Sequence, residues 1–482
     1  MNEDQLYNKR KLKPKTIHYN ELPSILATDD CVKVAGIDID GVLRGKLISK
    51  DKFLSIAQEG FGFASVLFAW DLQDQIYTEG PLISHAQNGY NDLLAVPDLQ
   101  SFRRIPWEDD VPFFLVNFLD PKTKESISAC PRSLLKRIAQ KLCAAGVVAM
   151  AGVEYEFSHF QLPEASVATH MSVSDKPKPL EESKFGYSIA RPVHNKAYYY
   201  DIFRTCGKFQ CPLEGWHAEV GPGMYEAALA FDEICEVADR AALFKLAVKS
   251  VAIKHSIKPS FMAKPIADSP GCSSHVHISL VDERLGSDKN LLFRAAPDEN
   301  MPIEALRGLS DIGRHFLAGI LTSLPSILPL LAPTVNSYKR LVENMWAPVT
   351  VSWGLEHRAA SVRIIMPPTC APEATRFEIR VPSADSNGAL VLAAILAAGW
   401  YGVTEKLDVE QLPLDASTAI SGKRLARNLR EATDAMSAKD SIARKLFGNE
   451  FVNHYAGSRY HECKLWDEAV TDWEVKRYLE IV

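Results

Sequence analysis

The chain has 482 residues, of which 47% are hydrophobic and 24% charged, so it is long enough for two or three globular domains with a large core. A formal net charge of −6 excludes the general positive field that would favour nucleic acid or an anionic membrane surface. The nine cysteines form no C-x-x-C pair, which is typical of a reducing compartment and argues against a zinc module. We therefore expect a cytoplasmic protein that binds neither nucleic acid nor membrane.

The beginning of the chain predicts a tail followed by a small sheet. Residues 1–16 are polar and basic and lack the apolar core of a signal peptide, so we expect a flexible tail. A strand from residue 32 with a hairpin partner over 44–48, a short helix over 52–58 and a strand over 111–119 form the next unit. This pattern indicates a mixed α+β unit that is mostly sheet and ends at a polar turn.

The rest of the chain alternates helical patterns with short strands. The apolar run over 388–403 is shorter than the ~20 residues of a membrane span and follows the capping residue Asn387, so it predicts a buried helix. The polar segment 161–184, rich in proline and serine, predicts a mobile loop over a cleft. The other predicted helices cover 133–145, 225–257, 303–324 (ended by Pro325) and 421–436 (capped by Ser421).

Three strand-like stretches place polar side chains on one face. In the stretch 376–380, Arg376, Glu378 and Arg380 share a face while the two intervening residues are apolar. The stretches 275–279 and 154–156 alternate in the same way, with histidines and glutamates on the polar face. One such strand alone is typical of a solvated salt-bridge ladder. Three together indicate a site.

A turn over 219–226 adds two more carboxylates to the predicted site. Its Gly-Pro-Gly sequence lets Glu219 and Glu226 converge, although Glu226 alone could simply begin the helix that follows. A cleft dominated by glutamates, with His275 as the one imidazole, suits Mg²⁺ or Mn²⁺ rather than zinc. So many acids would repel one another without divalent cations, which indicates two metal ions.

Several arginines accompany the acids, and no G-x-x-x-x-G-K-[ST] motif is present. Paired divalent metals with arginines are typical of sites that transfer phosphoryl groups. Because the P-loop motif is absent, the nucleotide would be held by other residues. With these motifs in place, the chain resembles type I glutamine synthetases over nearly its whole length. The resemblance rests on the stretches 152–157, 219–226, 264–279, 336–340, 357–363 and 376–380.

The resemblance implies an α+β fold with an N-terminal β-grasp domain over 17–125 and a catalytic domain over 126–482. The catalytic domain would contain an antiparallel sheet funnel, and chains would associate into rings with active sites between neighbours. The implied reaction has two steps. ATP phosphorylates the γ-carboxylate of glutamate, and an amine then displaces phosphate from γ-glutamyl phosphate.

The resemblance also implies roles residue by residue. Glu156, Glu219 and Glu226 would hold one metal ion, and Glu154, His275 and Glu378 the other. The nucleotide positions are Glu214, His277, Ser279, Arg363 and Arg376. Gly271, Arg340 and Arg380 would bind glutamate, and Arg340 and Arg358 would act on the reacting phosphate.

One departure from the family pattern concerns the amine. Members that use ammonia have a glutamate six residues after the arginine of the Asn-Ser-Tyr-Lys-Arg motif, where this chain has Trp346. Ala64 also aligns where those members offer an aspartate to a neighbouring chain's ammonium site. An ammonium ion needs a carboxylate for binding and deprotonation, whereas an indole face suits an organic amine. Trp346 is therefore a predicted selector of the amine.

Three functions remain open from the sequence. The first is a γ-glutamyl ligase that uses an organic amine, and the second is glutamine synthetase itself. The third is a scaffold or regulatory protein that has lost the reaction, which the intact acid set disfavours because buried acids without metals cost stability. The identity of the amine, the ring size and any filament formation are left undetermined.

Overall fold

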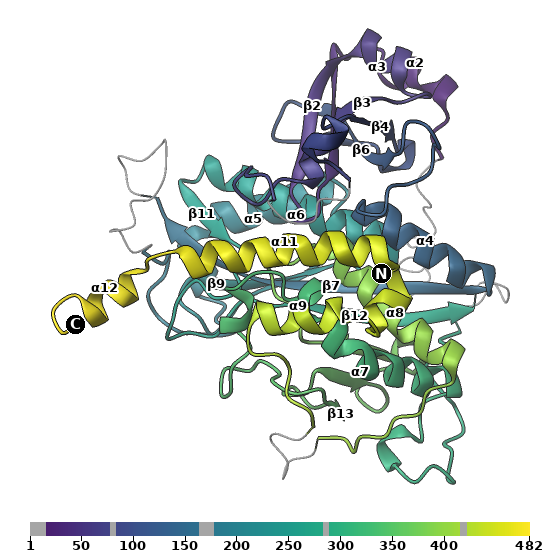
Figure 1. The fold of residues 1–482 in the computed structure, drawn as a ribbon, viewed down its shortest axis with the longest axis vertical. Helices are drawn as coiled ribbons and strands as arrows, with labels where there is room; N and C mark the ends of the chain where they lie inside the picture. Colours follow the sequence, from purple (N-terminus) through teal and green to yellow (C-terminus); the bar gives the residue numbers. More distant parts are fainter. Residues whose placement is uncertain (1–15, 78–82, 163–177, 283–288, 415–421) are drawn as a thin grey trace.

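A computed structural model describes residues 16–77, 83–162, 178–282, 289–414 and 422–482. The chain forms two lobes in Figure 1, a smaller one (purple to blue, at the top) formed by the early part of the sequence and a larger one in which long helices surround a second sheet. Each lobe combines strands and helices. The predicted α+β fold class is confirmed.

The smaller lobe contains a six-stranded sheet of order β2-β1-β6-β4-β3, with β5 paired to β6. The hairpin β1–β2 is antiparallel, as predicted, and β6 lies parallel to β1. The strands are β1 (Cys31–Ile37), β2 (Leu43–Ser49), β3 (Phe61–Ala64), β4 (Asp92–Pro97), β5 (Arg103–Ile105) and β6 (Val111–Leu119). Helices α2 (Leu22–Ile25) and α3 (Lys50–Ile56) accompany the sheet.

The larger lobe contains a nine-stranded sheet of order β13-β14-β15-β12-β7-β9-β8, with β10 and β11 also paired to β7. All its pairings are antiparallel except β13 with β14, so the predicted antiparallel character holds with one exception. The strands are β7 (Val147–Gln161), β8 (Leu213–Ala218), β9 (Met224–Leu229), β10 (Asp232–Glu233), β11 (Ile257–Ser260), β12 (Ser274–Asp282), β13 (Trp353–Leu355), β14 (Val362–Ile365) and β15 (Arg376–Ile379).

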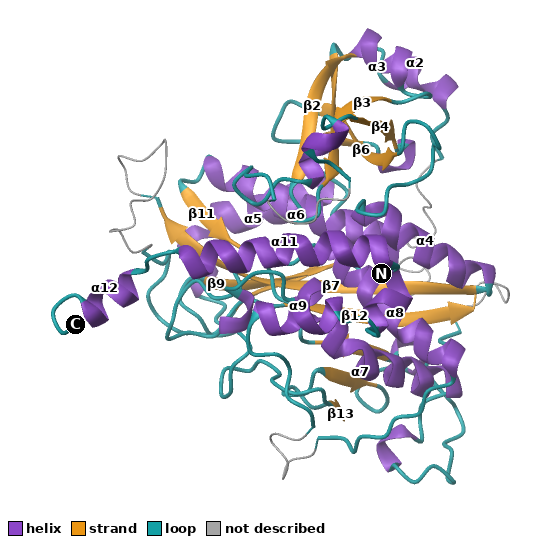
Figure 2. Cartoon of the chain, viewed as in Figure 1, coloured by secondary structure: helices purple, strands orange, loops and turns teal. Residues whose placement is uncertain are grey.

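Helices pack along this sheet, as Figure 2 shows, and α12 extends away from the body near the C-terminus. They are α4 (Pro131–Ala144), α5 (Lys196–Lys208), α6 (Ile234–Ile253), α7 (Asp311–Leu331), α8 (Gly388–Glu405), α9 (Leu429–Ser437), α10 (Ile442–Phe447), α11 (Asn449–Glu468) and α12 (Asp472–Tyr478). The predicted buried helix is α8, and the Asn387 side chain caps it by accepting a hydrogen bond from the Ala389 amide.

Two described helices, α7 and α8, are long and apolar enough to cross a membrane by length and composition alone. Their apolar windows are 78% and 67% buried inside the protein. Core helices of soluble proteins pass the same test, so this finding is weak evidence for a membrane span.

The helix predicted over 225–257 is wrong in its first and last parts. The chain instead forms β9 and β10, begins α6 at Ile234 and enters β11 at Ile257. Tyr225, Ala227 and Leu229 are buried while the residues between them face the other side, so the segment fits the pleat of β7. Pairing with a neighbouring strand outweighed local helical propensity here.

Two other helix boundaries also differ from prediction. Helix α7 begins at Asp311 after the cap Ser310 and continues through Pro325 and Pro329 to Leu331. Its apolar side chains are buried, and this packing outweighs the backbone hydrogen bonds that the two prolines remove. Helix α9 begins at Leu429 with Asn428 as its cap. The predicted cap Ser421, the N-terminal tail up to residue 15 and most of the predicted loop (163–177) lie outside the described residues.

Candidate active site

The pairing of the larger sheet brings the predicted acids and histidines opposite one another. Because alternate residues of a strand share a face, correct register on β7, β9, β12, β14 and β15 places all of these side chains on one side of the sheet. The facing pairs are Glu154 with His275, Glu156 with Glu226, and Glu378 with His277 and Arg363.

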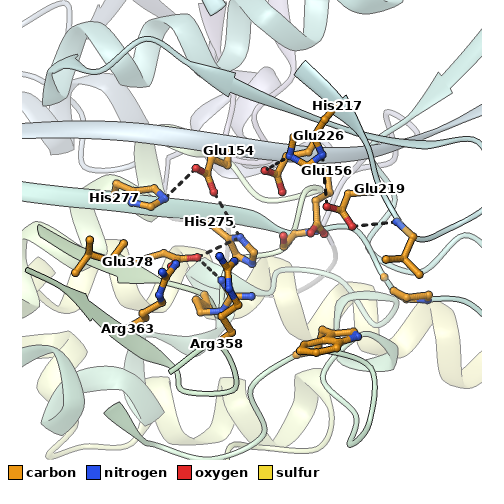
Figure 3. A pocket seen from close by; sticks show the side chains of 18 of the residues that line it. Glu154, Glu156, His217, Glu219, Glu226, His275, His277, Arg358, Arg363 and Glu378 are labelled. Carbon is orange, nitrogen blue, oxygen red and sulfur yellow. Dashed lines mark hydrogen bonds and ion pairs between the residues drawn. The ribbon is translucent and has the colours of Figure 1, made fainter. Parts of the chain in front are cut away.

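These side chains line a cavity of about 710 Å³, seen closely in Figure 3. The predicted residues in its wall are Glu154, Glu156, Glu219, Glu226, Gly271, His275, His277, Arg340, Trp346, Arg358, Arg363, Arg376, Glu378 and Arg380. The sequence therefore identified most of one continuous surface.

A second cavity of about 380 Å³ contains the two predicted residues that the first lacks, Glu214 and Ser279. Glu154, His277 and Arg376 line both cavities, so the two are adjacent. The Arg376 Nε donates a hydrogen bond of 3.1 Å to His277 Nδ1 at this shared wall. Four of the five predicted nucleotide residues thus line the second cavity, while Arg363 lies in the first.

Glu378 is the most enclosed acid of the site, with 1% of its surface exposed. Arg363 Nη1 donates to its Oε2 at 2.9 Å, and Arg380 Nη1 donates to its Oε1. Burial on its own would raise the pKa of Glu378, but the charges of His275 and Arg380 and the Arg363 hydrogen bond lower this pKa to about 2. The carboxylate therefore stays ionised and available as a ligand.

Glu154 lies between the two histidines of β12, as Figure 3 shows. Its Oε1 is 3.2 Å from His277 Nε2, and its Oε2 is 3.9 Å from His275 Nδ1. Burial opposes ionisation, yet the neighbouring imidazoles of His275 and His277 hold the pKa of Glu154 far below its usual value. Glu154 is consequently an anion at any physiological pH.

The turn between β8 and β9 brings Glu219 and Glu226 together, as the Gly-Pro-Gly sequence predicted. The Glu219 amide donates to the Met224 carbonyl across the turn, and Gly223 takes a positive φ of 59°. His217 joins both acids, with Nε2 at 3.1 Å from Glu226 Oε1 and Nδ1 at 3.7 Å from Glu219 Oε1.

The electrostatics of this turn show how crowded the acids are. Burial and the charge of Glu156 raise the pKa of the Glu219 carboxyl. Burial would lower the pKa of His217, but Glu226 and Glu219 outweigh it and raise this pKa to about 9. Sequence reasoning missed His217, although it stands on β8 two residues before Glu219, which directly follows that strand, and the same period-two rule could have found it.

Among the described residues, three groups of side chains could each hold a metal ion, because the ligand atoms within a group lie within 4.8 Å of one another. They are Glu154 with His277 and Glu378, Glu154 with Glu226 and His275, and His217 with Glu219 and Glu226. Carboxylate oxygens with single imidazoles fit Mg²⁺ or Mn²⁺, and a cation would relieve the repulsion that raises the pKa of Glu219. Glu156 lies in the same wall, where its Oε2 accepts a hydrogen bond from the Ser273 amide.

Two predicted arginines differ sharply in their surroundings. Arg340 is 2% exposed, and its Nη1 and Nη2 donate to the carbonyls of Val381 and Arg380 at 2.8 Å each. Gly271 packs so closely on it that an added Cβ would lie 2.7 Å from Arg340 Cγ. Arg358 lines the same cavity from an exposed position. The Arg340 guanidinium is thus anchored to the backbone that follows β15, whereas Arg358 faces the cavity.

Aromatic residues occupy another part of the cavity wall. Trp346 is 67% exposed with a positive φ of 59°, and Tyr187 is 69% exposed with a positive φ of 57°. The Tyr187 ring stacks on His217 at 4.3 Å between centroids. Only Trp346 was predicted; Tyr187 lies in a loop far away in sequence, and no period-two pattern marks it.

Known proteins resemble this chain in sequence and in fold. The family model described as glutamine synthetase, catalytic domain, matches residues 128–478. A Dictyostelium discoideum protein named type-1 glutamine synthetase 2 is 42% identical over 94% of this chain and 84% of its own length. A Pseudomonas glutamate–isopropylamine ligase is 33% identical over 94% of this chain and 95% of its own. A solved GmaS/ADP complex superposes with a TM-score of 0.77 at 26% identity, covering 95% of this chain and 99% of that one.

The fold and the cavity thus define a carbon–nitrogen ligase of the kind that activates a carboxylate with ATP. The chain belongs to the glutamine synthetase family. The recognition made from the motifs is confirmed. The chain is an ATP-dependent glutamate ligase, so the scaffold alternative is set aside.

Proposed function

We propose that this protein is a γ-glutamyl ligase that joins glutamate to an organic amine rather than to ammonia. The observation that carries the proposal is Trp346 in the cavity wall, at the position where ammonia-using members of the family have a glutamate. An indole neither binds NH₄⁺ strongly in water nor takes its proton. A relative named as an isopropylamine ligase supports the idea that the family fold accepts organic amines.

The acids of the cavity would hold two or more Mg²⁺ or Mn²⁺ ions. In the proposed arrangement Glu156, Glu219 and Glu226 hold one ion, and Glu154, His275 and Glu378 the other. The mixed group of Glu154, Glu226 and His275 suggests that the two sets are close enough to share ligands. When bound, such ions neutralise phosphate oxygens and stabilise the charge that develops during transfer.

The nucleotide would lie mainly in the second cavity, against Glu214, His277, Ser279 and Arg376. Its terminal phosphate would then lie near the residues that line both cavities, facing the first cavity. Arg363, which already donates to Glu378, would complete this set from the first cavity. We further propose that Arg358, exposed in the cavity, meets the negative charge of the reacting phosphate.

Glutamate would bind near Gly271, Arg340 and Arg380. Arg340 donates to the carbonyls of Arg380 and Val381, so it would act partly by fixing the segment that carries Arg380. Gly271 is needed because a side chain there would collide with Arg340. The γ-carboxylate would attack ATP to give γ-glutamyl phosphate, and the amine would then displace phosphate.

The wider organisation follows the family in this proposal. Residues 17–125 form the β-grasp domain and 126–482 the catalytic domain, and chains associate into rings with active sites between neighbours. All nine cysteines are free thiols, which supports a cytoplasmic location.

The decisive experiment is a panel of amine substrates. Release of ADP and phosphate is measured with glutamate, ATP and Mg²⁺ plus ammonium, alkylamines, polyamines or aromatic amines. At least one organic amine should exceed ammonium in kcat/KM by tenfold or more. Equal or faster turnover with ammonium than with every amine would overturn the proposal.

A substitution tests Trp346 directly. Trp346→Glu restores a carboxylate where the ammonia-using members have one, so the ratio of ammonium to amine kcat/KM should rise about 30-fold. Trp473→Glu, on the exposed face of α12, is the matched control and should leave the ratio unchanged. Unaltered selectivity in Trp346→Glu would show that another residue selects the amine.

Glutamine synthetase itself is the second candidate function. The observation in its favour is the 42% identity to a protein named type-1 glutamine synthetase 2. In that case an acid from a neighbouring chain would replace the missing glutamate, and the same panel would show ammonium as the preferred substrate.

A further inference from the structure

Two bulky aromatic residues of the first cavity have left-handed backbone conformations, Trp346 at φ 59° and Tyr187 at φ 57°. Bulky side chains rarely adopt this region because Cβ then approaches the carbonyl oxygen. Such strain clusters at ligand and catalytic sites, although in this chain Tyr90, outside the cavity, also takes a positive φ of 51°. Core packing does not explain it here, since both side chains are more than two-thirds exposed.

The loop that carries Tyr187 is held against the acid cluster. Gly186 lies beside Val220, so that an added Cβ would be 3.3 Å from Val220 Cγ2. The Val220 amide donates to Glu219 Oε2 at 3.0 Å, and the Tyr187 ring stacks on His217, which contacts both Glu219 and Glu226. An apolar surface therefore borders the acids directly.

Trp346 and its neighbours in sequence add further apolar side chains to the wall of the same cavity. Met345 and Ala347 line the same cavity, as do Tyr187 and Val220. We name these five residues, 187, 220 and 345–347, the apolar rim. An amine whose nitrogen lies near the acid cluster can place a substituent on the apolar rim.

The charges in the cavity limit what that substituent can be. Every acid in the wall has a partner among the described residues: Glu378 and Glu356 pair with arginines, Glu154 and Glu226 with histidines, and Glu156 and Glu219 accept from backbone amides. The basic side chains of the wall are five arginines and three histidines. A second ammonium carried by a substituent on the apolar rim would lose water with no carboxylate among the five rim residues to pair with it, which disfavours it.

We infer that the amine substrate is a primary monoamine with an uncharged, apolar alkyl or aryl substituent, held by Tyr187 and Trp346. This inference rests on the proposed amine ligase and specifies its substrate class. The amine nitrogen forms the C–N bond with the carbonyl carbon of the γ-carboxyl group as the bond from that carbon to the phosphate oxygen breaks and phosphate leaves with the electron pair. Of the two protons that the ammonium nitrogen loses, one ends on the phosphate and one is released.

The test compares pairs of amines of similar length that differ in one feature, together with ammonium and an aromatic amine. With saturating ATP and glutamate, kcat/KM is measured for ammonium, ethanolamine, propylamine, hexylamine, 1,6-diaminohexane and phenethylamine. We expect hexylamine or phenethylamine to exceed 1,6-diaminohexane by tenfold or more, and propylamine to exceed ethanolamine. A preference for the diamine or for ethanolamine would overturn the substrate class but leave the amine ligase intact.

Variants of the two rings separate binding from folding. Tyr187→Ala and Trp346→Ala should each raise KM for the apolar amine about tenfold while KM for ATP and for glutamate stay unchanged. Trp473→Ala, an exposed tryptophan outside the cavity, should change none of these. The thermal shift with ATP and methionine sulfoximine, which mimics the phosphorylated acid, verifies that each variant still forms the activating site. Unchanged amine KM in both ring variants would refute the inference, whereas ammonium as the best substrate would refute the proposed function itself.

Discussion

The two sides of the first cavity are built in opposite ways. On the side that we propose activates the acid, called here the strand side, Glu154, His275 and Glu378 project from paired strands and are held by hydrogen bonds and ion pairs. On the side of the apolar rim, Tyr187 and Trp346 lie outside the strands in left-handed conformations, with their rings exposed. Strands fix geometry for chemistry that every member needs, while loops carry the residues that vary the substrate.

Removal of divalent metal should give the largest effect on activity. Both proposed metal ions are held on the strand side, so their loss removes the activating chemistry and leaves the apolar rim intact. Chelation with EDTA should abolish ADP release, and Mg²⁺ or Mn²⁺ should restore it. At 100 times its Kd, a metal bound only by the native state adds about 2.7 kcal/mol of stability, so the melting temperature should rise on addition. Full activity in EDTA would contradict the assignment of the acid cluster.

Glu378→Gln should come next in size. The substitution keeps the shape but removes the charge that holds Arg363 and Arg380, so kcat should fall on the order of 10³-fold. Glu410→Gln, in an exposed loop, is the matched control and should retain full activity. A loss below tenfold in a folded Glu378→Gln protein would show that this carboxylate is not central.

The buried ring of His159 allows a test, by pH, of the packing beneath the turn that carries Glu219 and Glu226. The ring is buried beneath the turn that joins Glu219 to Glu226, its Nδ1 donating to the Gly223 carbonyl at 3.0 Å, and burial lowers its pKa to about 4. Below pH 6.5 the unfolded chain binds a proton that the folded ring does not accept until about pH 4. The contribution of His159 to stability should thus be complete above pH 6.5 and fall by about 3 kcal/mol between pH 6.5 and 4, and the buried His454, whose pKa is likewise lowered to about 4, should add a similar fall.

The measurement is chemical unfolding across this pH range. His159→Asn keeps a donor but lacks the titration, so its loss of stability on acidification should be smaller than that of the unmodified protein. Parallel pH profiles for the two proteins would contradict the assignment to His159.

The smallest predicted effect concerns strain on the loop side. At position 346 the backbone favours glycine, so Trp346→Gly should be more stable than Trp346→Ala by about 1 kcal/mol. Trp473 lies within α12, so there the order should reverse, with Ala more stable than Gly by about 1 kcal/mol. Melting temperatures of the four variants give the answer. An order of Ala above Gly at both positions would show that residue 346 is unstrained.

Much of the strand side followed from the sequence because its rule is local. Alternation placed Arg376, Glu378 and Arg380 on one face with Phe377 and Ile379 in the core, where both are fully buried. The motif spacing then linked these residues to the family. The same local reasoning failed at Tyr225, where helical propensity and strand pairing disagreed and a partner strand decided.

The sequence by itself determined the α+β class, the family, the arginines of the cavity, all of its acids and histidines except Glu356 and His217, and the unusual tryptophan among them. Only the tertiary structure decided which acids lie together, that His217 joins Glu219 to Glu226, that Arg340 anchors to the backbone of Arg380, and that Tyr187 shares a cavity with Trp346. The physical reason is range. Alternation and capping depend on a few neighbouring residues, whereas register, loop closure and left-handed strain depend on contacts between segments far apart in the chain.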